Sequence, residues 1–268
     1  MTDPHAQEAN GDFVSFEQRG RVAVVTLERP EALNAISGAL AQELAATTAR
    51  IAANRDIWVV VLAAAGERAF CVGADLKERA SFSLDDWHAN RVAMRAMFAA
   101  LRGLQQPSVA SVFGFALGGG FELALSCDLI VAADDVELGL PEAGVGLVPA
   151  GGATQLLARA LGTSRAKEII FTGRRIGAEE ALAAGLVAKV VPRSELRAQT
   201  LALADAICRA SPVALRAAKG AIDAALGLPL EQGIEAENDA WRATVSSADR
   251  VEGIAAFNAK RDPRWSNR

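Results

Sequence analysis

The chain has 268 residues, 51% of them hydrophobic, and its 28 basic and 32 acidic side chains give a net charge of −4. This length can bury a large core, and the mild acidity excludes a surface field that would attract nucleic acid or an anionic membrane. Three scattered cysteines form no CxxC pair or disulfide framework, which indicates a reducing compartment, and only two histidines nearly exclude a histidine-rich metal site.

The amino-terminal segment 1–11 is short, polar and glycine-terminated, so we predict that it is a disordered tail. It contains neither an apolar signal core nor an arginine-rich transit helix. No run in the chain approaches the roughly 18 apolar residues that a membrane-spanning helix needs. We therefore expect a soluble, cytoplasmic protein.

Strands and helices are predicted to alternate after this segment. The β-branched run 21–27 and the apolar run 57–63 predict strands, and apolar residues at three- and four-residue steps predict a helix over 37–53. The alternation continues with helices expected at 83–104 and 119–126 and strands at 108–113, 128–133 and 186–191. This order predicts an α/β domain with largely parallel strand pairing.

The strand signal disappears after Pro192, and the rest of the chain is predicted to be helical. The expected helices span 194–209, 212–226, 230–246 and 250–259. Asp249, with Glu252 three residues later, forms a capping-box-like start for the last one. Because this piece is small for a core of its own, we expect it to pack against its parent domain or another subunit.

The strongest signal for chemistry is FGFALGGGFEL at 113–123, where Gly118, Gly119 and Gly120 stand between a predicted strand and a predicted helix. Glycines let backbone N–H groups approach a ligand, and a helix start adds unpaired N–H donors and a partial positive charge. Such a turn suits an anion, or an oxygen that becomes anionic during a reaction. Glu122 lies about one helical turn beyond Gly119, so it either faces the same space or caps the helix.

Two further segments repeat these features. AFCVGADLK at 69–77 is a glycine loop after a predicted strand, which is the right place for a second exposed N–H. LGLPEAGVGLVPAG at 138–151 places Glu142 in a loop directly after a proline. The nucleotide-binding patterns GxxxxGK[ST] and GxGxxG do not fit. Two glycine loops and two glutamates form a constellation, whereas each feature alone is a weak signal.

Together these pieces resemble the crotonase superfamily of enoyl-CoA hydratases and isomerases, from Phe13 to Trp265. The matching segments are RPEALNAI (29–36), AFCVGADLKER (69–79), GFALGGGFELALSCDLIVA (114–132), LPEAGVGLVPAGG (140–152), the run 172–187 and AFNAKRDPRW (256–265). CVGADLKERA and PRW are similar to the methylglutaconyl-CoA hydratase branch in particular. The resemblance implies a spiral of repeated ββα units over 12–192 and a helical region over 193–268 that assembles trimers or dimers of trimers.

The resemblance implies an acyl-CoA thioester substrate and no metal or cofactor beyond the CoA that the substrate carries. The N–H groups of Ala74 and Gly119 would hold the thioester oxygen, and the two glutamates of family hydratases fall on Glu122 and Glu142. Family isomerases typically keep only the second glutamate, so both together favour hydration of 2-enoyl-CoA to 3-hydroxyacyl-CoA. We assign Glu122 to the attacking water and Glu142 to the proton that reaches C2, and the reverse assignment stays open.

The resemblance also implies where CoA binds. The residues expected there are Cys71, Val72, Gly73, Ala74, Leu76, Lys77 and Gly118. Phe257 and Lys260, in a tail that can come from a neighbouring subunit, would supply an apolar contact and a phosphate partner. Lys260 also fits a solvated terminal pair with Arg261. Glu31 stands where relatives often carry lysine, which weakens a phosphate contact at that position.

Three alternatives stay open at this point. They are Δ3-Δ2-enoyl-CoA isomerisation, hydration restricted to branched substrates such as 3-methylglutaconyl-CoA, and RNA binding, since the resembling branch includes an RNA-binding member. That member is lysine-rich where this chain has only Arg50 and then Arg55, so RNA binding is disfavoured. The sequence leaves open the acyl chain length and the pathway, whether fatty-acid oxidation, amino-acid breakdown or another.

Overall fold

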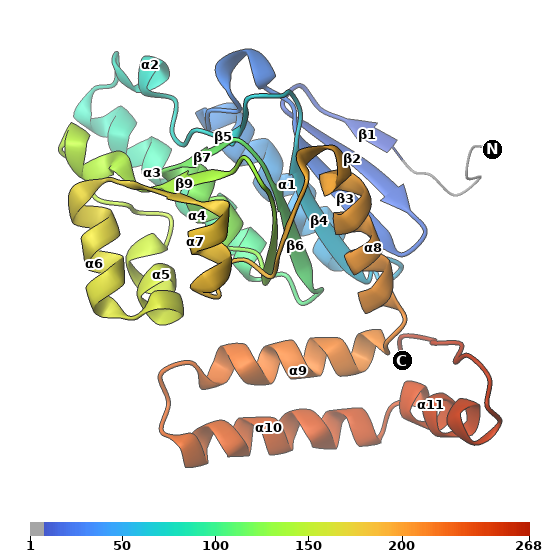
Figure 1. Cartoon of the computed structure of the whole chain (residues 1–268). Helices are drawn as coiled ribbons and strands as arrows, with labels where there is room; N and C mark the ends of the chain where they lie inside the picture. The colour runs from blue at the N-terminus through green and yellow to red at the C-terminus, as the bar shows by residue number, and fades with distance from the viewer. Residues whose placement is uncertain (1–7) are drawn as a thin grey trace.

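Two β-sheets form the core in the computed structural model, which describes residues 8–268 (Figure 1). The larger sheet holds, in spatial order, β1 (Glu8–Asn10), β2 (Val14–Arg19), β3 (Val22–Leu27), β4 (Val59–Ala64), β6 (Ser108–Val112), β8 (Leu129–Ala133) and β11 (Lys189–Val191). The smaller sheet holds β10 (Arg175–Gly177), β9 (Glu137–Gly139), β7 (Phe115–Leu117) and β5 (Ala69–Cys71). Pairing is parallel from β3 to β11 and from β5 to β9, which confirms the prediction of a largely parallel domain.

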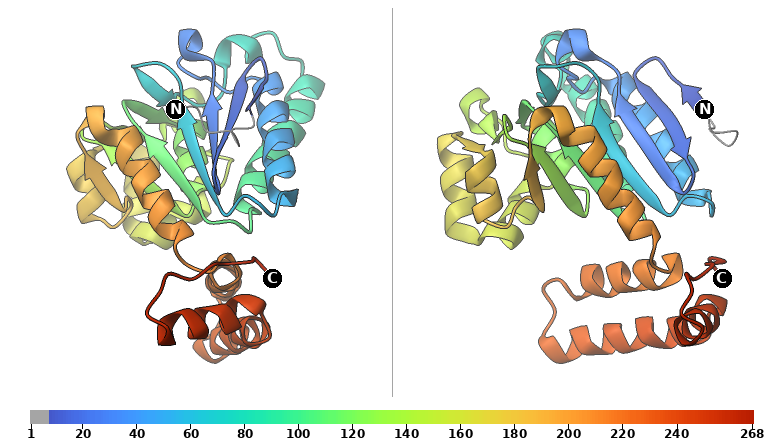
Figure 2. Two further views of the ribbon diagram at one scale, coloured as in Figure 1. Left: turned by 90° about the vertical axis from the view of Figure 1, so that its right-hand side faces the viewer. Right: turned by 45° about the vertical axis from the view of Figure 1, so that its right-hand side comes forward.

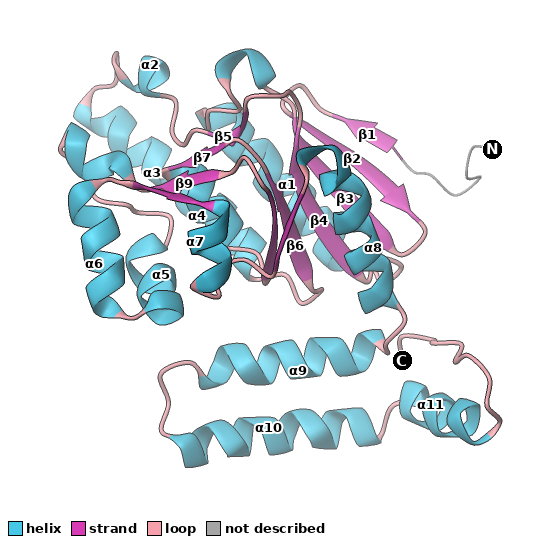
Figure 3. Ribbon diagram, viewed as in Figure 1, coloured by secondary structure: helices cyan, strands magenta, loops and turns pink. Residues whose placement is uncertain are grey.

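Helices follow the strands in the order that the sequence pattern predicts (Figure 3). They are α1 (Gly38–Ala53), α2 (Leu76–Arg79), α3 (Leu84–Arg102), α4 (Gly119–Leu125), α5 (Ala153–Leu161), α6 (Thr163–Thr172), α7 (Ala178–Ala183), α8 (Leu196–Cys208), α9 (Pro212–Ala225), α10 (Leu230–Val245) and α11 (Ala248–Asn258). Short 3-10 turns occur at η1 (Pro30–Ala32), η2 (Pro141–Val145) and η3 (Arg193–Glu195). None of the helices described is long and apolar enough to cross a membrane.

Strands of the two sheets alternate along the chain. β4 of the larger sheet is followed by β5 of the smaller one, β6 by β7, and β8 by β9, and helices follow each pair. This arrangement is the expected spiral of ββα units. Because β5, β7 and β9 are parallel neighbours, the segments that leave their carboxyl ends meet at one edge of the smaller sheet.

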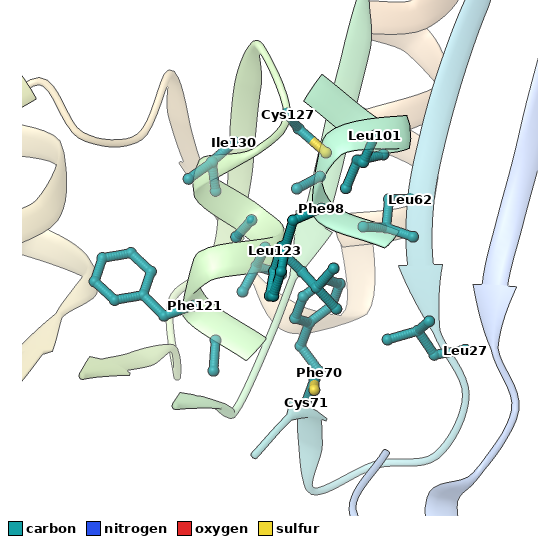
Figure 4. Close-up of a cluster of buried hydrophobic side chains, with 14 of the residues drawn as sticks. Leu27, Leu62, Phe70, Cys71, Phe98, Leu101, Phe121, Leu123, Cys127 and Ile130 are labelled. Carbon is teal, nitrogen blue, oxygen red and sulfur yellow. The ribbon is translucent and has the colours of Figure 1, made fainter. Parts of the chain in front are cut away.

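β3 and β4 are buried on both faces because successive side chains enter two different apolar clusters. Val22 and Val24 pack with residues of α8 in the smaller cluster. Ala23 and Val25 belong to the larger cluster, to which α1, α3 and α4 contribute. Figure 4 shows part of that cluster, including Phe98 of α3. The apolar runs in the sequence therefore form the central layer of the domain.

The amino-terminal segment differs from its prediction where the structure describes it. Glu8–Asn10 form β1, which pairs antiparallel with β2 and places Ala9 opposite Phe16. Without β1, β2 would be the edge strand of the sheet, with free backbone groups that can accept another strand. A disordered tail is therefore wrong for 8–10, while 1–7 lie outside the described residues.

The helices after β11 lie in two places. α8 covers the larger sheet, whereas α9 and α10 run antiparallel in a layer beneath the core and α11 continues that layer (Figure 2). The predicted start of α11 is wrong: its cap is Ser247, whose side chain accepts from Arg250 N at 3.0 Å. Asp249 is buried and instead accepts from Ser266 N and the Ser211 hydroxyl, both at 2.8 Å. This carboxylate therefore ties the end of the chain to the start of α9.

Candidate active site

A cavity of about 320 Å³ opens where the segments after β5, β7 and β9 meet. Ala74 follows β5, Gly119 and Glu122 follow β7 in α4, and Glu142 follows β9 in η2. All four residues line this cavity. The parallel register of three neighbouring strands thus brings together groups that are up to 68 positions apart in the sequence, as Ala74 and Glu142 are.

Two backbone N–H groups lie close together on neighbouring turns that line this cavity. A Cβ placed on Gly73 would lie 3.0 Å from Gly119 N, and one on Gly119 would lie 3.8 Å from Ala74 N. The first turn is fixed by Ile36, whose N–H donates to Gly73 O at 2.7 Å. In the part of the chain that the structure describes, neither the Ala74 nor the Gly119 N–H donates to a backbone or side-chain acceptor. The pair can therefore donate to one oxygen of a ligand.

The glycines that surround these N–H groups are required by close approach. Gly73 has a φ of +91°, which favours glycine, and its Cβ would lie 2.8 Å from Leu117 O. Gly120 packs still closer, because a Cβ there would lie 2.0 Å from Cys71 O. These contacts let α4 lie directly against the loop after β5.

Glu122 is only 3% exposed, and one of its oxygens is held by the start of α5. Its Oε1 accepts from Gly151 N at 2.7 Å, from Gly152 N at 2.9 Å and from Ala153 N at 3.0 Å. These are the N–H groups that a helix start leaves unpaired. Oε2 accepts no hydrogen bond from the described residues, so Glu122 keeps a free acceptor while its orientation is fixed.

Glu142 stands in a different environment on the other side of the cavity. Its Oε2 is buried without a hydrogen-bond partner among the described residues. Its Oε1 lies close to Gly118, where a Cβ would approach it to 3.0 Å. Burial raises the pKa of Glu142 to about 7, and the negative charge of Glu122 adds to the shift. Near neutral pH this carboxyl group can therefore carry a proton or release one.

The residues expected to bind CoA separate into two groups. Val72, Gly73, Leu76 and Gly118 line the cavity together with Ala74. Cys71 and Lys77 do not line it. The Cys71 side chain is fully buried in the apolar core beside Phe70, and burial raises the pKa of its thiol to about 12 (Figure 4). Strand β5 points the Cys71 side chain away from the cavity, so the expected contact between this loop and CoA, through its backbone, stays a prediction.

Phe257 and Lys260 lie far from the cavity of their own chain. Phe257 is 83% exposed on α11, and Lys260 follows that helix. Figure 1 places α11 beneath the core, at the opposite end from α2 and α3. The structure therefore does not bring these two residues to the site within one chain.

Several cavity residues were not identified from the sequence. One set lies at the end of α2 and along one face of α3, at helical spacing: Arg79, Trp87, Asn90, Arg91, Met94 and Phe98. The periodicity of 83–104 shows that one face of the helix points inward. It does not show whether that face packs against the core or lines a cavity. The backbone donors to Glu122 at 151–153 were not identified from the sequence either. The adjacent glycines Gly151 and Gly152 could have indicated a turn with exposed N–H groups.

The described residues contain no group of three or more His, Cys, Asp or Glu side chains that could hold a metal ion. The chemistry that this site offers consists of two carboxyl groups in unlike environments and a pair of N–H donors. Such a set can transfer protons and stabilise a developing oxyanion.

Comparison with known proteins gives consistent results. The model of the enoyl-CoA hydratase/isomerase family matches residues 17–268. The Bacillus subtilis protein YngF is 42% identical over 252 residues, which cover 94% of this chain and 97% of YngF. The short-chain-enoyl-CoA hydratase of Clostridium acetobutylicum is 37% identical over 92% of this chain and 95% of its own. The crystal structure of an enoyl-CoA hydratase from Bacillus anthracis is 39% identical and superposes with a TM-score of 0.93, covering 95% of this chain and 99% of that one.

Proposed function

The chain belongs to the enoyl-CoA hydratase/isomerase family and is an enzyme that hydrates 2-enoyl-CoA thioesters, and we propose that the cavity between Glu122 and Glu142 is its active site. The observation that carries this proposal is the convergence of two carboxyl groups and two free N–H donors on one cavity. We further propose that the reaction uses no cofactor besides the CoA of the substrate.

The N–H groups of Ala74 and Gly119 would bind the thioester oxygen. As water adds to C3, negative charge develops on that oxygen, and the two hydrogen bonds strengthen. An interaction that is stronger in the transition state than in the ground state accelerates the reaction, and one such donor contributes roughly 3–4 kcal/mol in comparable sites.

The two carboxyl groups would divide the proton transfers between them. Glu122, whose Oε2 is free, takes a proton from the attacking water, so that hydroxide character develops on the oxygen that bonds to C3. Glu142, whose pKa is raised to about 7, delivers its proton to C2. The proton then passes back from Glu122 to Glu142 within the cavity, which restores the starting state. The raised pKa of Glu142 favours this assignment over the reverse one.

The test is the hydration of crotonyl-CoA, followed by the loss of enoyl absorbance. Glu122→Gln and Glu142→Gln should each lower turnover by roughly 100-fold or more, since each removes one proton-transfer group. Glu179→Gln, at an exposed glutamate of α7 outside the cavity, is the matched control and should leave turnover unchanged. Turnover of a 3-enoyl-CoA without hydration of crotonyl-CoA would instead assign the enzyme as an isomerase.

We also propose a homotrimer or a dimer of trimers in the cytoplasm. Support comes from the position of Phe257 and Lys260, which can contact CoA only if they approach the cavity of a neighbouring subunit. In that assembly Lys260→Ala should raise KM for the substrate and leave kcat nearly unchanged, because Lys260 would contact only the CoA phosphates.

A further inference from the structure

A cationic side chain that forms no ion pair within the described part of the chain is part of the cavity wall. Arg79, at the end of α2, lines the same cavity as Glu122 and Glu142. Its Nη2 donates to Asn90 Oδ1 at 2.9 Å, and its guanidinium carbon lies 5.1 Å from the centroid of the Trp87 ring. Its Nε is buried without a hydrogen-bond partner in the described part of the chain. The guanidinium is thus fixed by two neighbours on α3 and keeps an unused buried donor.

The carboxylates nearest to Arg79 are engaged elsewhere. Asp75 accepts from Arg29 Nη1 at 2.8 Å, and Glu78 accepts from Gly38 N at 3.0 Å. No ion pair to Arg79 is formed by any carboxylate that the structure describes. Burial lowers the pKa of Arg79, the charge of Glu78 opposes this shift, and Arg91, which also lines the cavity, adds to it. The Arg79 side chain is half-buried, and a cation that has lost part of its hydration is stabilised when an anion binds beside it.

Helix α3 shows where Arg79 stands relative to the reacting atoms. Phe98 lies at the end of the cavity near Glu122, because a Cβ on Gly151 would approach the Phe98 ring to 2.5 Å and Glu122 Oε2 to 2.7 Å. Asn90, which binds Arg79, precedes Phe98 by eight residues, or about 12 Å along the axis of an α-helix. Met94 lines the cavity between these two levels. Along α3 the cavity wall therefore passes from the Glu122 carboxylate, by the apolar side chain of Met94, to the Arg79 guanidinium.

We propose that Arg79, positioned by Asn90 and Trp87, binds an anionic group at the far end of the acyl chain. The preferred substrates would then be 2-enoyl-CoA thioesters of dicarboxylic acids, whose second carboxylate lies several carbons beyond C3. A carboxylate can accept charge-assisted hydrogen bonds from the guanidinium of Arg79, which lines the cavity. This inference rests on the proposed hydratase function, and it assigns Arg79 to substrate specificity.

The experiment compares substrates of equal length that differ only in the terminal carboxylate. The first pair is 2-hexenedioyl-CoA and 2-hexenoyl-CoA, and the second is 2-octenedioyl-CoA and 2-octenoyl-CoA. For at least one pair the unmodified enzyme should show kcat/KM about tenfold or more higher for the diacid. Arg79→Gln should lower kcat/KM for the diacid roughly 10- to 100-fold, the effect expected for one charge-assisted contact, and change the monoacid by less than about threefold.

Two further variants distinguish charge from folding. Arg79→Lys should restore part of the diacid preference, since it keeps the positive charge without the paired donors. Arg95→Gln, at an exposed residue of α3 outside the cavity wall, should leave both substrates unchanged. Hydration of monoacids and diacids at equal rates by the unmodified enzyme would overturn the inference and leave the hydratase function intact. An equal loss for both substrates in Arg79→Gln would overturn it as well, because it would place Arg79 beside the CoA phosphates. If the unmodified enzyme hydrates neither the monoacid nor the diacid substrates, the result contradicts the proposed hydratase function itself.

Discussion

At the scale of single residues, the site consists of two glutamates that have the same chemistry and different surroundings. Three N–H groups from the start of α5 hold one oxygen of Glu122. Glu142 has no such donors at its buried oxygen, and burial raises its pKa to about 7. One residue type can therefore serve as base and as acid in the same cavity, because the environments differ.

The raised pKa of Glu142 predicts a pH profile for hydration. In the proposed mechanism the proton that reaches C2 comes from Glu142, so the active form is the protonated one, and it is lost as the pH rises through about 7. We expect kcat/KM for crotonyl-CoA to fall about tenfold per pH unit well above that value. The two carboxyl groups interact, so the measured pKa belongs to the pair. A rate that stays level up to pH 9 would contradict the role of Glu142 as the acid.

The three donors around Glu122 predict unequal effects of two substitutions on stability. Glu122→Gln keeps an oxygen that can accept from the N–H groups of Gly151, Gly152 and Ala153, so the free energy of unfolding should change by less than about 1 kcal/mol. Glu122→Ala leaves these donors without an acceptor and should cost about 2–4 kcal/mol. Urea unfolding of both variants measures the difference. Equal stability of the two would show that water replaces the carboxylate without cost.

At the scale of elements, the site depends on how closely α4 approaches β5. The Cβ of an alanine at Gly120 would lie 2.0 Å from Cys71 O, a contact that only movement of the backbone can relieve. We expect such a movement to change the distance between the Ala74 and Gly119 N–H groups, because Gly120 and Cys71 belong to the same two segments as these donors. The stability of the domain and the geometry of the proposed oxyanion site are therefore set by the same packing contact.

Gly120→Ala should consequently destabilise the protein by about 3 kcal/mol and lower hydration of crotonyl-CoA. The control is Gly220→Ala in α9, where a Cβ would meet nothing within 4 Å. Because alanine favours a helix interior over glycine, this control should be neutral or more stable by about 0.5–1 kcal/mol. Thermal unfolding compares the two. Equal melting temperatures would mean that the backbone adjusts at Gly120.

At the scale of the whole molecule, the layer formed by α9, α10 and α11 leaves large apolar side chains exposed. They are Ile222, Leu226, Leu228, Leu230, Ile234, Trp241, Val245, Val251, Ile254 and Phe257. α10 contains no buried residue, although its sequence is amphipathic. An apolar surface of this kind is typical of a protein interface.

This surface supports the prediction of a trimer or a dimer of trimers. Light scattering at micromolar concentration should give three or six times the mass of the chain. Trp241→Arg, at a residue that is 64% exposed in α10, should dissociate the assembly, because a charge would be buried in the interface. Arg242→Ala, at its exposed neighbour, is the control. A monomer at these concentrations would contradict the prediction.

Sequence patterns alone predicted the order of elements, the family and the two glutamates that line the cavity. These features can be recognised in short segments. Hydrophobic periodicity shows which face of a helix or strand is buried, and consecutive glycines mark the turns. The structure of 8–10, the true cap of α11 and the partners of Glu122 were not predictable in the same way. The last two depend on contacts with other segments, as when Asp249 binds Ser266 instead of capping its own helix. β1 pairs with its neighbour β2, although its sequence EAN has no strand pattern.

The identity of the residues that line the cavity, and the effect of burial on their charges, follow from the packing of the folded chain. The parallel pairing of β5, β7 and β9 brings three loops together, and α3 supplies a wall that the sequence shows only as a covered face. Burial then raises the pKa of Glu142 to about 7 and leaves Arg79 Nε without a hydrogen-bond partner among residues 8–268. Solvent exclusion is a property of the packed molecule, so no pattern along the chain can reveal it.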